Sequence, residues 1–225
     1  MAEAMSTVRA DFERIALLAG EGWDHSSHYH GFLARQVPAP CREALEVGCG
    51  TGPFSRILAK SSERVLALDL SPNMIRVARE RSAQFPNIDF RVADVLALEL
   101  PPEAFDCVAT IATLHHLPLK EVLTKLKSAL KANGVLLVLD LFQTEGLSDA
   151  FRSALALPLS LGLRLMRHGR LNAPREVRRA WAEHGRHDSY LTLPQVHEVC
   201  AEVLPGAEVR KHLLWRYSVV WKKIG

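Results

Sequence analysis

Short hydrophobic runs alternate with longer amphipathic segments through the middle of the chain. The runs are rich in Val, Ile and Leu and almost continuous in hydrophobicity, which is typical of strands buried on both faces of a sheet. They cover residues 43–48, 64–70, 88–94, 105–112 and 134–141. This pattern predicts five strands in the first two thirds of the chain.

The segments between these strands repeat apolar residues three or four positions apart, as one face of a helix does. They cover residues 54–62, 71–84 and 119–134. Ser71 is the predicted N-cap of the second helix, with Pro72 at its first position, and Asn133-Gly134 is the predicted left-handed end of the third. Strands that alternate with helices predict an α/β fold, in which a parallel sheet with right-handed crossovers is covered by helices.

The last part of the chain returns to the same kinds of pattern. Thr192 is the predicted cap of a helix that has Pro194 near its start and runs to about residue 204. Residues 206–214 and 217–223 then alternate apolar and polar positions, which predicts two strands of a hairpin joined at Trp215-Arg216.

Two segments interrupt the alternation of strands and helices. Residues 1–40 precede the first strand and are predicted to form a helical cap, with helices over 8–18 and about 28–36. Residues 142–190 form a connection far longer than an ordinary link, and such connections are usually lids or binding elements. We therefore divide the chain into a cap (1–40), a core (41–141), a lid (142–190) and a segment that completes the core (191–225).

The composition fits one globular α/β domain with an insertion, since 48% of the 225 residues are apolar and 24% are charged. Lys and Arg minus Asp and Glu gives −4 for residues 1–150 and +7 for residues 151–225. A basic face can attract nucleic acid, anionic lipid or an acidic substrate, but solvated Lys and Arg on helices are the commoner explanation. The charge asymmetry is therefore weak evidence for any partner.

The cysteines and the apolar segments indicate in which cellular compartment the protein is expected. The four cysteines have no CxxC spacing, which favours neither a zinc site nor a disulfide framework. Because the first twenty residues lack the continuous apolar stretch of a signal peptide and no run is long enough to span a bilayer, we expect a cytoplasmic protein. The leucine-rich residues 154–166 contain Pro158 and Gly162, and a lid helix packed on the core is favoured over a helix on a membrane surface.

Three glycines follow the first strand at alternate positions, Gly48, Gly50 and Gly52. Glycines between a strand and a helix permit positive φ and let a ligand approach the backbone, while the helix N-terminus offers N–H groups. A nucleotide-like ligand is therefore expected. The nicotinamide fingerprint G-x-G-x-x-G fails because Pro53 occupies its last glycine position, and no Gly-Lys-Ser/Thr follows to complete a phosphate-binding Walker loop.

The segment "EVGCGTG" resembles the E/D-x-G-x-G-x-G motif of the class I S-adenosylmethionine-dependent methyltransferases. Further segments are similar to this family in the right order: "DLSPNM", "RVADV", "FDCVATIATLHHL" and "LKANGVLLVLDL". The likeness is strong over about residues 40–141, and in the rest of the chain only the general order of the predicted elements resembles the family. It implies a Rossmann-like class I methyltransferase fold, with a mostly parallel seven-stranded sheet, an antiparallel strand in the C-terminal hairpin and a helical cap.

The resemblance also implies a cofactor, S-adenosyl-L-methionine, and residues that bind it. Asp69 would bind both ribose hydroxyls, and Asp94 would accept a hydrogen bond from the adenine amino group. Glu46 would orient the glycine loop or reach the cofactor's ammonium group through water. The other expected cofactor-binding residues are Gly48, Cys49, Gly50, Gly52, Leu70, Met74, Val95, Ile111 and, closing over the cofactor's carboxylate, Tyr29.

Methyl transfer from a sulfonium needs no obligatory catalytic group, but a hydroxyl or thiol acceptor must lose a proton. His116 is the first catalytic residue expected, as base or substrate anchor, and His115 is the second; capping a helix or packing beneath the lid is an equally weighted alternative. His25, His28 and His30 lack a Cys or acidic partner at metal-binding spacing, so no metal site is expected.

The link at Trp215-Arg216 is expected to lie beside the substrate entrance. Arg216 could meet an anionic substrate there, while Trp215 and Tyr217 could contact an aromatic one or, as we favour, pack the sheet edge.

Several classes of methyltransferase are disfavoured by the fourth strand. It reads Thr110-Ile111-Ala112-Thr113, where a nucleic-acid N-methylating enzyme would carry Asn/Asp-Pro-Pro-Tyr and a metal-dependent catechol-type enzyme would carry acids. The sequence therefore predicts a methyltransferase for a small, apolar or aromatic molecule, as a monomer or homodimer with no obligate nucleic acid. A binding protein that holds the cofactor without turnover and an RNA methyltransferase that uses the basic tail remain alternatives.

Overall fold

The computed structural model describes residues 2–18, 20, 22–169, 173–186 and 188–224. A seven-stranded sheet forms its centre, in the order β3-β2-β1-β4-β5-β7-β6. The strands are β1 (Glu43–Val47), β2 (Arg64–Asp69), β3 (Ile88–Val92), β4 (Phe105–Ile111), β5 (Leu130–Leu141), β6 (Glu208–Lys211) and β7 (Arg216–Lys222). The first five are parallel, and β7 is antiparallel to both β5 and β6. The mostly parallel sheet with an antiparallel C-terminal strand is thus confirmed.

Helices cover both faces of the sheet because successive strand residues point to opposite sides. Leu136 and Val138 of β5 pack with α5 and α8, whereas Leu137 and Leu139 pack with α2 and α3 on the other face. The helices and 3₁₀ turns before the fifth strand are α1 (Ala2–Leu18), η1 (Ser27–Tyr29), α2 (His30–Ala34), α3 (Ser55–Leu58), α4 (Pro72–Arg81), η2 (Leu114–His116) and α5 (Leu119–Ala129). Those after it are α6 (Gly146–His168), α7 (Arg175–His184) and α8 (Leu193–Val203).

Both predicted side-chain caps are confirmed. The Ser71 hydroxyl accepts from the Met74 N–H at the start of α4, and Thr192 forms a reciprocal capping box with Gln195 at the start of α8. The hairpin is also confirmed, although its link covers residues 212–215 and Arg216 already belongs to β7.

The predicted end of the third helix is wrong. The helix α5 ends at Ala129, and Asn133 has a positive φ of 64° but lies within β5. Leu130 is fully buried and pairs with Phe105 of β4, so the chain is already extended three residues before the left-handed position. Other predicted helices differ in their bounds: α1 begins at Ala2 instead of residue 8, only Ser55–Leu58 is helical within 54–62, and residues 28–36 hold the end of η1 and the short α2.

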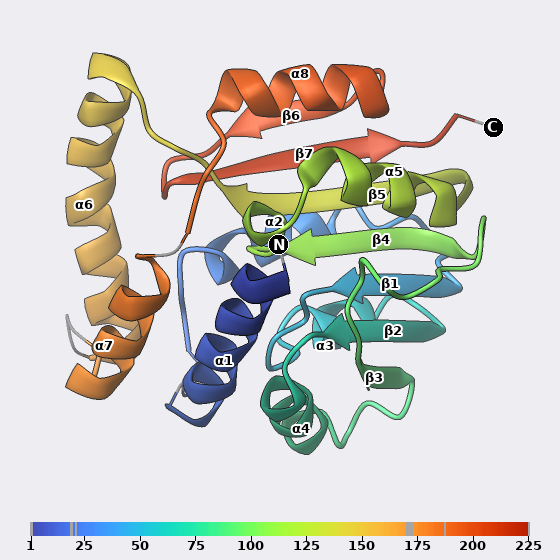
Figure 1. The fold of residues 1–225 in the computed structure, drawn as a ribbon, viewed down its shortest axis with the longest axis horizontal. Coiled ribbons are helices and arrows are strands. Elements are labelled where there is room, and N and C mark those ends of the chain that lie inside the picture. Colours follow the sequence, from blue (N-terminus) through green and yellow to red (C-terminus); the bar gives the residue numbers. More distant parts are fainter. Residues whose placement is uncertain (1, 19, 21, 170–172, 187, 225) are drawn as a thin grey trace.

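The helices α1, α6 and α7 lie beyond the carboxyl ends of the parallel strands, toward which the arrows of β1 and β4 point in Figure 1. Ile15 and Ala16 of α1 pack with Met74 of α4 and Ala180 of α7, which joins the N-terminal helix to the 142–190 segment. This arrangement places helices over the edge of the sheet where ligands bind in open α/β folds.

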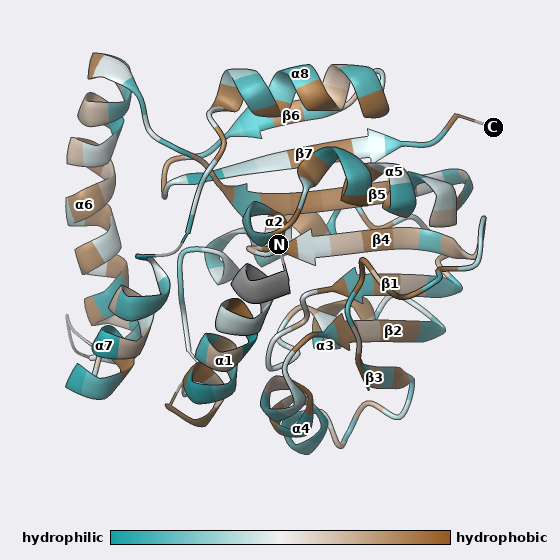
Figure 2. Ribbon diagram, in the orientation of Figure 1, coloured by the Kyte–Doolittle hydropathy of each residue, from teal (hydrophilic) through white to brown (hydrophobic). Residues whose placement is uncertain are grey.

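The helix α6 spans 23 residues, and only a narrow stripe of its surface packs against the rest of the protein. Ala156 and Ser160 are buried, but Leu155 and Leu157 are 51% and 55% exposed. Figure 2 shows hydrophobic residues along most of its length. The helix therefore packs on the protein mainly through Asp149, Ala156 and Ser160, while most of its leucines are exposed. None of the described helices is both long and apolar enough to cross a bilayer.

Candidate functional site

A cavity of about 450 Å³ opens at the carboxyl ends of β1, β2 and β4, and we call it the first cavity. Eleven of the predicted site residues line it: Glu46, Gly48, Cys49, Gly50, Asp69, Leu70, Met74, Asp94, Val95, Ile111 and His116. These residues come from four separate strand ends and the turns that follow them. The sheet thus brings together groups that are up to 70 positions apart in the chain.

The three glycines of the loop differ in what they do. A Cβ on Gly48 would lie 2.0 Å from the Thr113 Oγ1 atom, and one on Gly52 would lie 2.9 Å from the Phe90 ring. A Cβ on Gly50 would have no atom within 4 Å. All three have positive φ, between 53° and 79°. Gly48 and Gly52 are therefore required by packing, whereas Gly50 leaves bare backbone beside an open cavity.

Asp69 ends β2 and holds the glycine loop in place. Its Oδ2 accepts from the Gly50 N–H at 2.8 Å and its Oδ1 accepts from the Ser71 N–H at 2.9 Å. Burial raises the pKa of Asp69, and the hydrogen bonds from Ser71 and Gly50 oppose this rise. Each oxygen retains a further acceptor position, so the carboxylate can also accept from a ligand that presents two hydroxyls.

Glu46 is fully buried beneath the loop at the end of β1. The Ser55 hydroxyl donates to its Oε2 at 2.5 Å. Burial raises the pKa of Glu46 to about 8, although the hydrogen bond from Ser55 lowers it. A buried carboxyl of this kind favours a cationic group of a ligand, which would hold it in the charged form.

Three predicted site residues lie outside the first cavity. Gly52 packs against Phe90, and His115 lines a neighbouring cavity. The expectation for Tyr29 is corrected by the structure: its hydroxyl accepts from the Leu214 N–H at 3.1 Å and its ring packs on His212. Tyr29 packs on the face of the sheet covered by α2 and does not line the first cavity.

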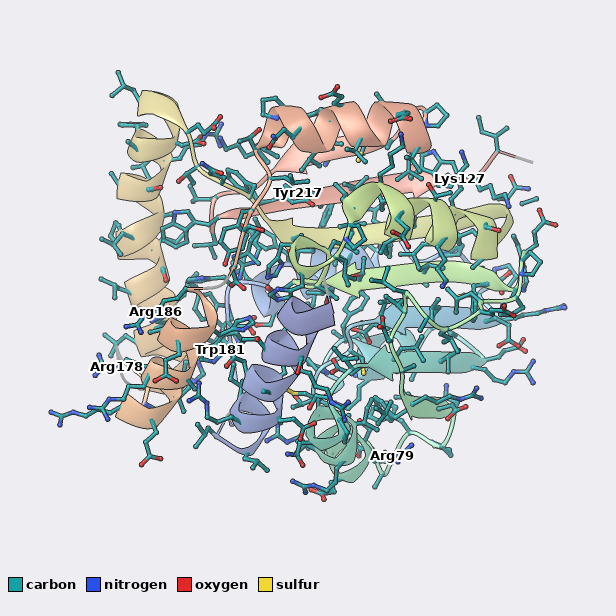
Figure 3. The ribbon with its side chains drawn as sticks, viewed as in Figure 1. Arg79, Lys127, Arg178, Trp181, Arg186 and Tyr217 are labelled. Carbon is teal, nitrogen blue, oxygen red and sulfur yellow. The ribbon has the colours of Figure 1, made fainter. Side chains whose placement is uncertain are left out.

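A second cavity, of about 650 Å³, adjoins the first and shares His116, Phe12 and Trp181 with it. Its walls come from the cap, η2, α6, α7 and the start of β7. Trp181 lies between α7 and α1 in Figure 3. Its ring meets the Phe12 ring edge to face, with 6.4 Å between the two ring centroids. Arg216 lines this cavity, whereas Tyr217 is buried in the core, as the favoured sequence interpretation predicted.

His115 is oriented by a buried carboxylate in the wall of the second cavity. Its Nδ1 lies 2.6 Å from Asp140 Oδ1, and its backbone N–H donates to Asp140 Oδ2 at 3.0 Å. A carboxylate only accepts, so Nδ1 carries the proton and Nε2 is the basic nitrogen. Asp140 is fully buried at the end of β5, and this hydrogen bond fixes both the ring orientation and the tautomer.

His116 lies in a second group of polar side chains. Asp188 Oδ1 is 3.5 Å from His116 Nδ1 and 3.6 Å from His184 Nε2, and Tyr190 donates to Asp188 Oδ2 at 2.7 Å. Burial, followed by the nearby His115, lowers the pKa of His116 to about 4. His116 is therefore a neutral imidazole at ordinary pH.

One ligand atom from each of His115, His116 and Asp188 lies within 4.8 Å of the others, which makes this cluster the candidate metal site among the residues that the structure describes. A tetrahedral ion with ligands at about 2.1 Å would hold them about 3.4 Å apart, and His115 already uses Nδ1 on Asp140. We assign no ion to the cluster, and the absence of a metal stays a prediction.

Sequence reasoning missed Asp140, His184, Asp188 and Tyr190. A signal was present for Asp140, since it ends a hydrophobic strand run in "VLDL" as Asp69 does in "LALDL". The other three lie in the 142–190 connection, where no strand end or repeat identifies their position.

Comparisons with known proteins identify the family. The model of the methyltransferase domain matches residues 45–138. An uncharacterised methyltransferase of Mycobacterium bovis is 30% identical over 204 residues, which cover 89% of this chain and 96% of the relative. The chain belongs to the class I S-adenosylmethionine-dependent methyltransferases. It is thus an enzyme of methyl transfer, and its cofactor is S-adenosylmethionine.

Two further proteins are similar to this methyltransferase. The ubiquinone biosynthesis O-methyltransferase of Xanthomonas campestris is 31% identical over 150 residues, which cover 60% of this chain and 62% of that relative, less than two thirds of its length. The crystal structure of the N-methyltransferase NodS from Bradyrhizobium japonicum, in complex with S-adenosylhomocysteine, has a TM-score of 0.63 at 17% identity. The alignment covers 96% of this chain and 98% of NodS and shows the same fold.

The first cavity of the methyltransferase fits its cofactor in size and chemistry. It is lined by the buried carboxyl group of Glu46 and the half-buried carboxyl group of Asp69, and it includes the open space beside the Gly50 backbone. Backbone N–H groups there suit a carboxylate, and the acids suit hydroxyl and ammonium groups. The fit of these residues agrees with the family, while the role of each stays a prediction.

Proposed function

We propose that this methyltransferase methylates a hydroxyl or thiol group of a small, aromatic or apolar molecule bound in the second cavity, with His115 as general base. The observation that carries the proposal is the 2.6 Å hydrogen bond between His115 Nδ1 and Asp140 Oδ1 in the cavity wall. The sequence favoured His116 over His115. The order is reversed here because His115 forms a 2.6 Å hydrogen bond with a buried carboxylate, which fixes its tautomer, whereas the carboxylate beside His116, that of Asp188, lies 3.5 Å away.

S-adenosylmethionine supplies a methyl group that is already activated by the positive charge on sulfur. The acceptor hydroxyl or thiol gives its proton to His115 Nε2, and the negative charge of Asp140 stabilises the imidazolium that results. The acceptor atom then forms the new bond to the methyl group, and the electrons of the broken bond return to sulfur. Helices α1, α6 and α7 hold the acceptor in place and exclude water from the reaction.

The chemistry of the cavity wall supports an aromatic or apolar acceptor. Phe12, Trp23 and Trp181 line the second cavity, together with Leu18 and Val177. Aromatic rings of a ligand pack well against such side chains. The name of the Xanthomonas relative, an O-methyltransferase, supports oxygen as the acceptor atom.

We also propose how the first cavity holds the cofactor. Asp69 binds the ribose hydroxyls, Asp94 and Val95 contact the adenine, and Glu46 lies toward the ammonium group. The bare backbone at Gly50 lets the cofactor approach the loop. Residues 1–40 and 142–190 act as cap and lid over both cavities. Contact of residues 154–166 with a membrane surface stays the less favoured alternative, and the cap and lid stay predictions. So do the cytoplasmic location and the monomeric or homodimeric state.

Turnover with a panel of phenols and thiols tests this function. His115→Gln and Asp140→Asn are expected to lower kcat by about 10² to 10⁴, because each removes proton transfer to an oriented base. The affinity for S-adenosylhomocysteine should stay unchanged in both variants, since neither residue lines the first cavity. His197→Gln, an exposed histidine on α8, is the matched control. Full activity of His115→Gln on every acceptor would refute the assignment of the base.

A further inference from the structure

Arg216 stands at the start of β7 and lines the second cavity. Its Nε donates to the Ser26 hydroxyl at 3.0 Å, and its Nη1 donates to the Trp215 carbonyl at 3.2 Å. Both partners are neutral. Within the part of the chain that the structure describes, no carboxylate forms an ion pair with this guanidinium, although it is partly buried and faces a cavity.

The surroundings of Arg216 leave its positive charge largely uncompensated. Burial lowers its pKa, and the charges of Asp24 and Asp140 oppose this without reaching ion-pair distance. Asp140 is held by His115, and Asp24 accepts from the Ser27 N–H at 2.6 Å. Both acids hydrogen-bond to groups of the protein and neither forms an ion pair with Arg216, so the guanidinium can still pair with an anionic ligand in the cavity.

The rest of the cavity carries both signs of charge. Arg164 of α6 and the exposed Arg178 of α7 line it together with the acids Asp24 and Asp188, and Arg178 lies on the outer side of α7 in Figure 3. Burial, followed by the charges of Arg216 and Arg164, lowers the pKa of His25 to about 4. Around His25 and Arg216 the positive charges therefore outweigh that of Asp24, which favours an anionic ligand beside these residues.

We propose that the methyl acceptor carries a carboxylate group and that Arg216 binds it inside the second cavity. This inference rests on the proposed function, because it places the acceptor in that cavity. Nη1 and Nη2 still present one N–H each on the end of the guanidinium, which matches the two oxygens of one carboxylate. In the β5–β7 register Arg216 pairs with Leu141, the residue after Asp140. The carboxylate site and the base His115 therefore flank the same strand end, and a hydroxy acid can reach both.

Arg216 acts on binding and not on the chemical step. It sets which acceptors enter the cavity, whereas His115 handles the proton. A structural role alone, such as anchoring Ser26 of the cap, would instead lower the affinity for all ligands together.

Binding of three probes to the full chain, in the presence of S-adenosylhomocysteine, tests the inference. The probes are 4-hydroxybenzoate, its neutral methyl ester and 4-hydroxyphenyl phosphate, measured by calorimetry. The wild type is expected to bind the acid at least about tenfold more tightly than the ester, since a charge-assisted hydrogen bond contributes that much. Arg216→Gln should remove this preference, and Arg216→Lys should keep part of it.

Two controls separate this inference from its alternatives. Arg210→Gln, on the neighbouring strand β6 and outside the cavity, should keep the wild-type preference. Arg216→Gln should bind S-adenosylhomocysteine normally, because Arg216 does not line the first cavity. His115→Gln should keep the preference for the acid while turnover is lost, so failure of the proposed base would leave the Arg216 result intact.

Three results would overturn the inference. Equal affinity of the wild type for acid and ester would show that the cavity does not recognise the charge. A preference that survives in Arg216→Gln would exclude this residue as its source. Tighter binding of the phosphate than of the carboxylate, lost in Arg216→Gln, would replace the carboxylate by a phosphate as the recognised group.

Discussion

The Gly50 N–H donates to Asp69 Oδ2 at 2.8 Å, which joins the loop after β1 to the end of β2. The same carboxylate therefore holds the loop and faces the first cavity. Gly50 leaves open space in the first cavity because it has no side chain, and Asp69 places two acceptor oxygens beside that space. Several expected outcomes depend on it and on the buried groups around it.

Replacement of Asp69 should remove cofactor binding. Asp69→Ala deletes both acceptors and releases the Gly50 N–H, so the affinity for S-adenosylhomocysteine should fall by about 100-fold, as expected for the loss of charge-assisted hydrogen bonds. Asp69→Asn keeps one acceptor oxygen, so its affinity for S-adenosylhomocysteine should fall less than that of Asp69→Ala. Calorimetric titration measures both values. An Asp69→Ala protein that binds the cofactor with wild-type affinity would contradict the assignment of this residue.

The loop glycines should respond differently to alanine. Gly50→Ala meets no atom, so it should cost only about 1 kcal/mol of folding stability from its positive φ, yet lower cofactor affinity by filling the open space. Gly48→Ala should destabilise the fold by several kcal/mol, because its Cβ would overlap Thr113. Urea unfolding and cofactor titration of the two variants separate the effects. Equal loss of stability in both would contradict the different roles.

Glu46 should make folding stability depend on pH in a particular window. Its pKa is about 8 in the folded protein and 4.5 when unperturbed, so the folded state binds this proton more tightly. The stabilisation is fully present below pH 4.5 and is lost as the pH rises toward 8. Glu46→Gln keeps the neutral shape and cannot ionise. Its stability relative to wild type should therefore increase by a few kcal/mol between pH 5 and pH 8 in urea unfolding, and a constant difference would contradict the shift.

His116 should affect acceptor binding more than proton transfer. Burial and His115 lower its pKa to about 4, so it is neutral throughout the range in which the enzyme is assayed. His116→Gln should raise KM for the acceptor and leave the pH dependence of kcat unchanged. The pH profile of His116→Gln beside that of the wild type checks this. A profile that loses its acidic limb would return the role of base to His116.

The cofactor half of the site was largely predictable from the sequence because it consists of local signals. Strand, glycine loop and helix follow one another directly, and the acids Glu46 and Asp69 stand at strand ends that a parallel sheet brings to one edge. Ser71 and Thr192 cap the helices that follow them, since capping involves residues only three positions apart. The sequence did not reveal where Tyr29 lies, because the residues of a short helix do not determine the face of the sheet on which that helix packs.

The hydrophobic pattern by itself determined that this chain forms a parallel sheet with a C-terminal hairpin, and the glycines after the first strand indicated a site for a nucleotide-like ligand. Only the tertiary structure decided which histidine is oriented by a buried carboxylate and that Arg216 faces the second cavity without an ion-pair partner among the described residues. His115 meets Asp140 across 25 positions, and His184 and Asp188 meet His116 through the packing of α7 on α1. Such contacts depend on strand register and helix docking, which balance many weak interactions across the whole chain and leave no local signature.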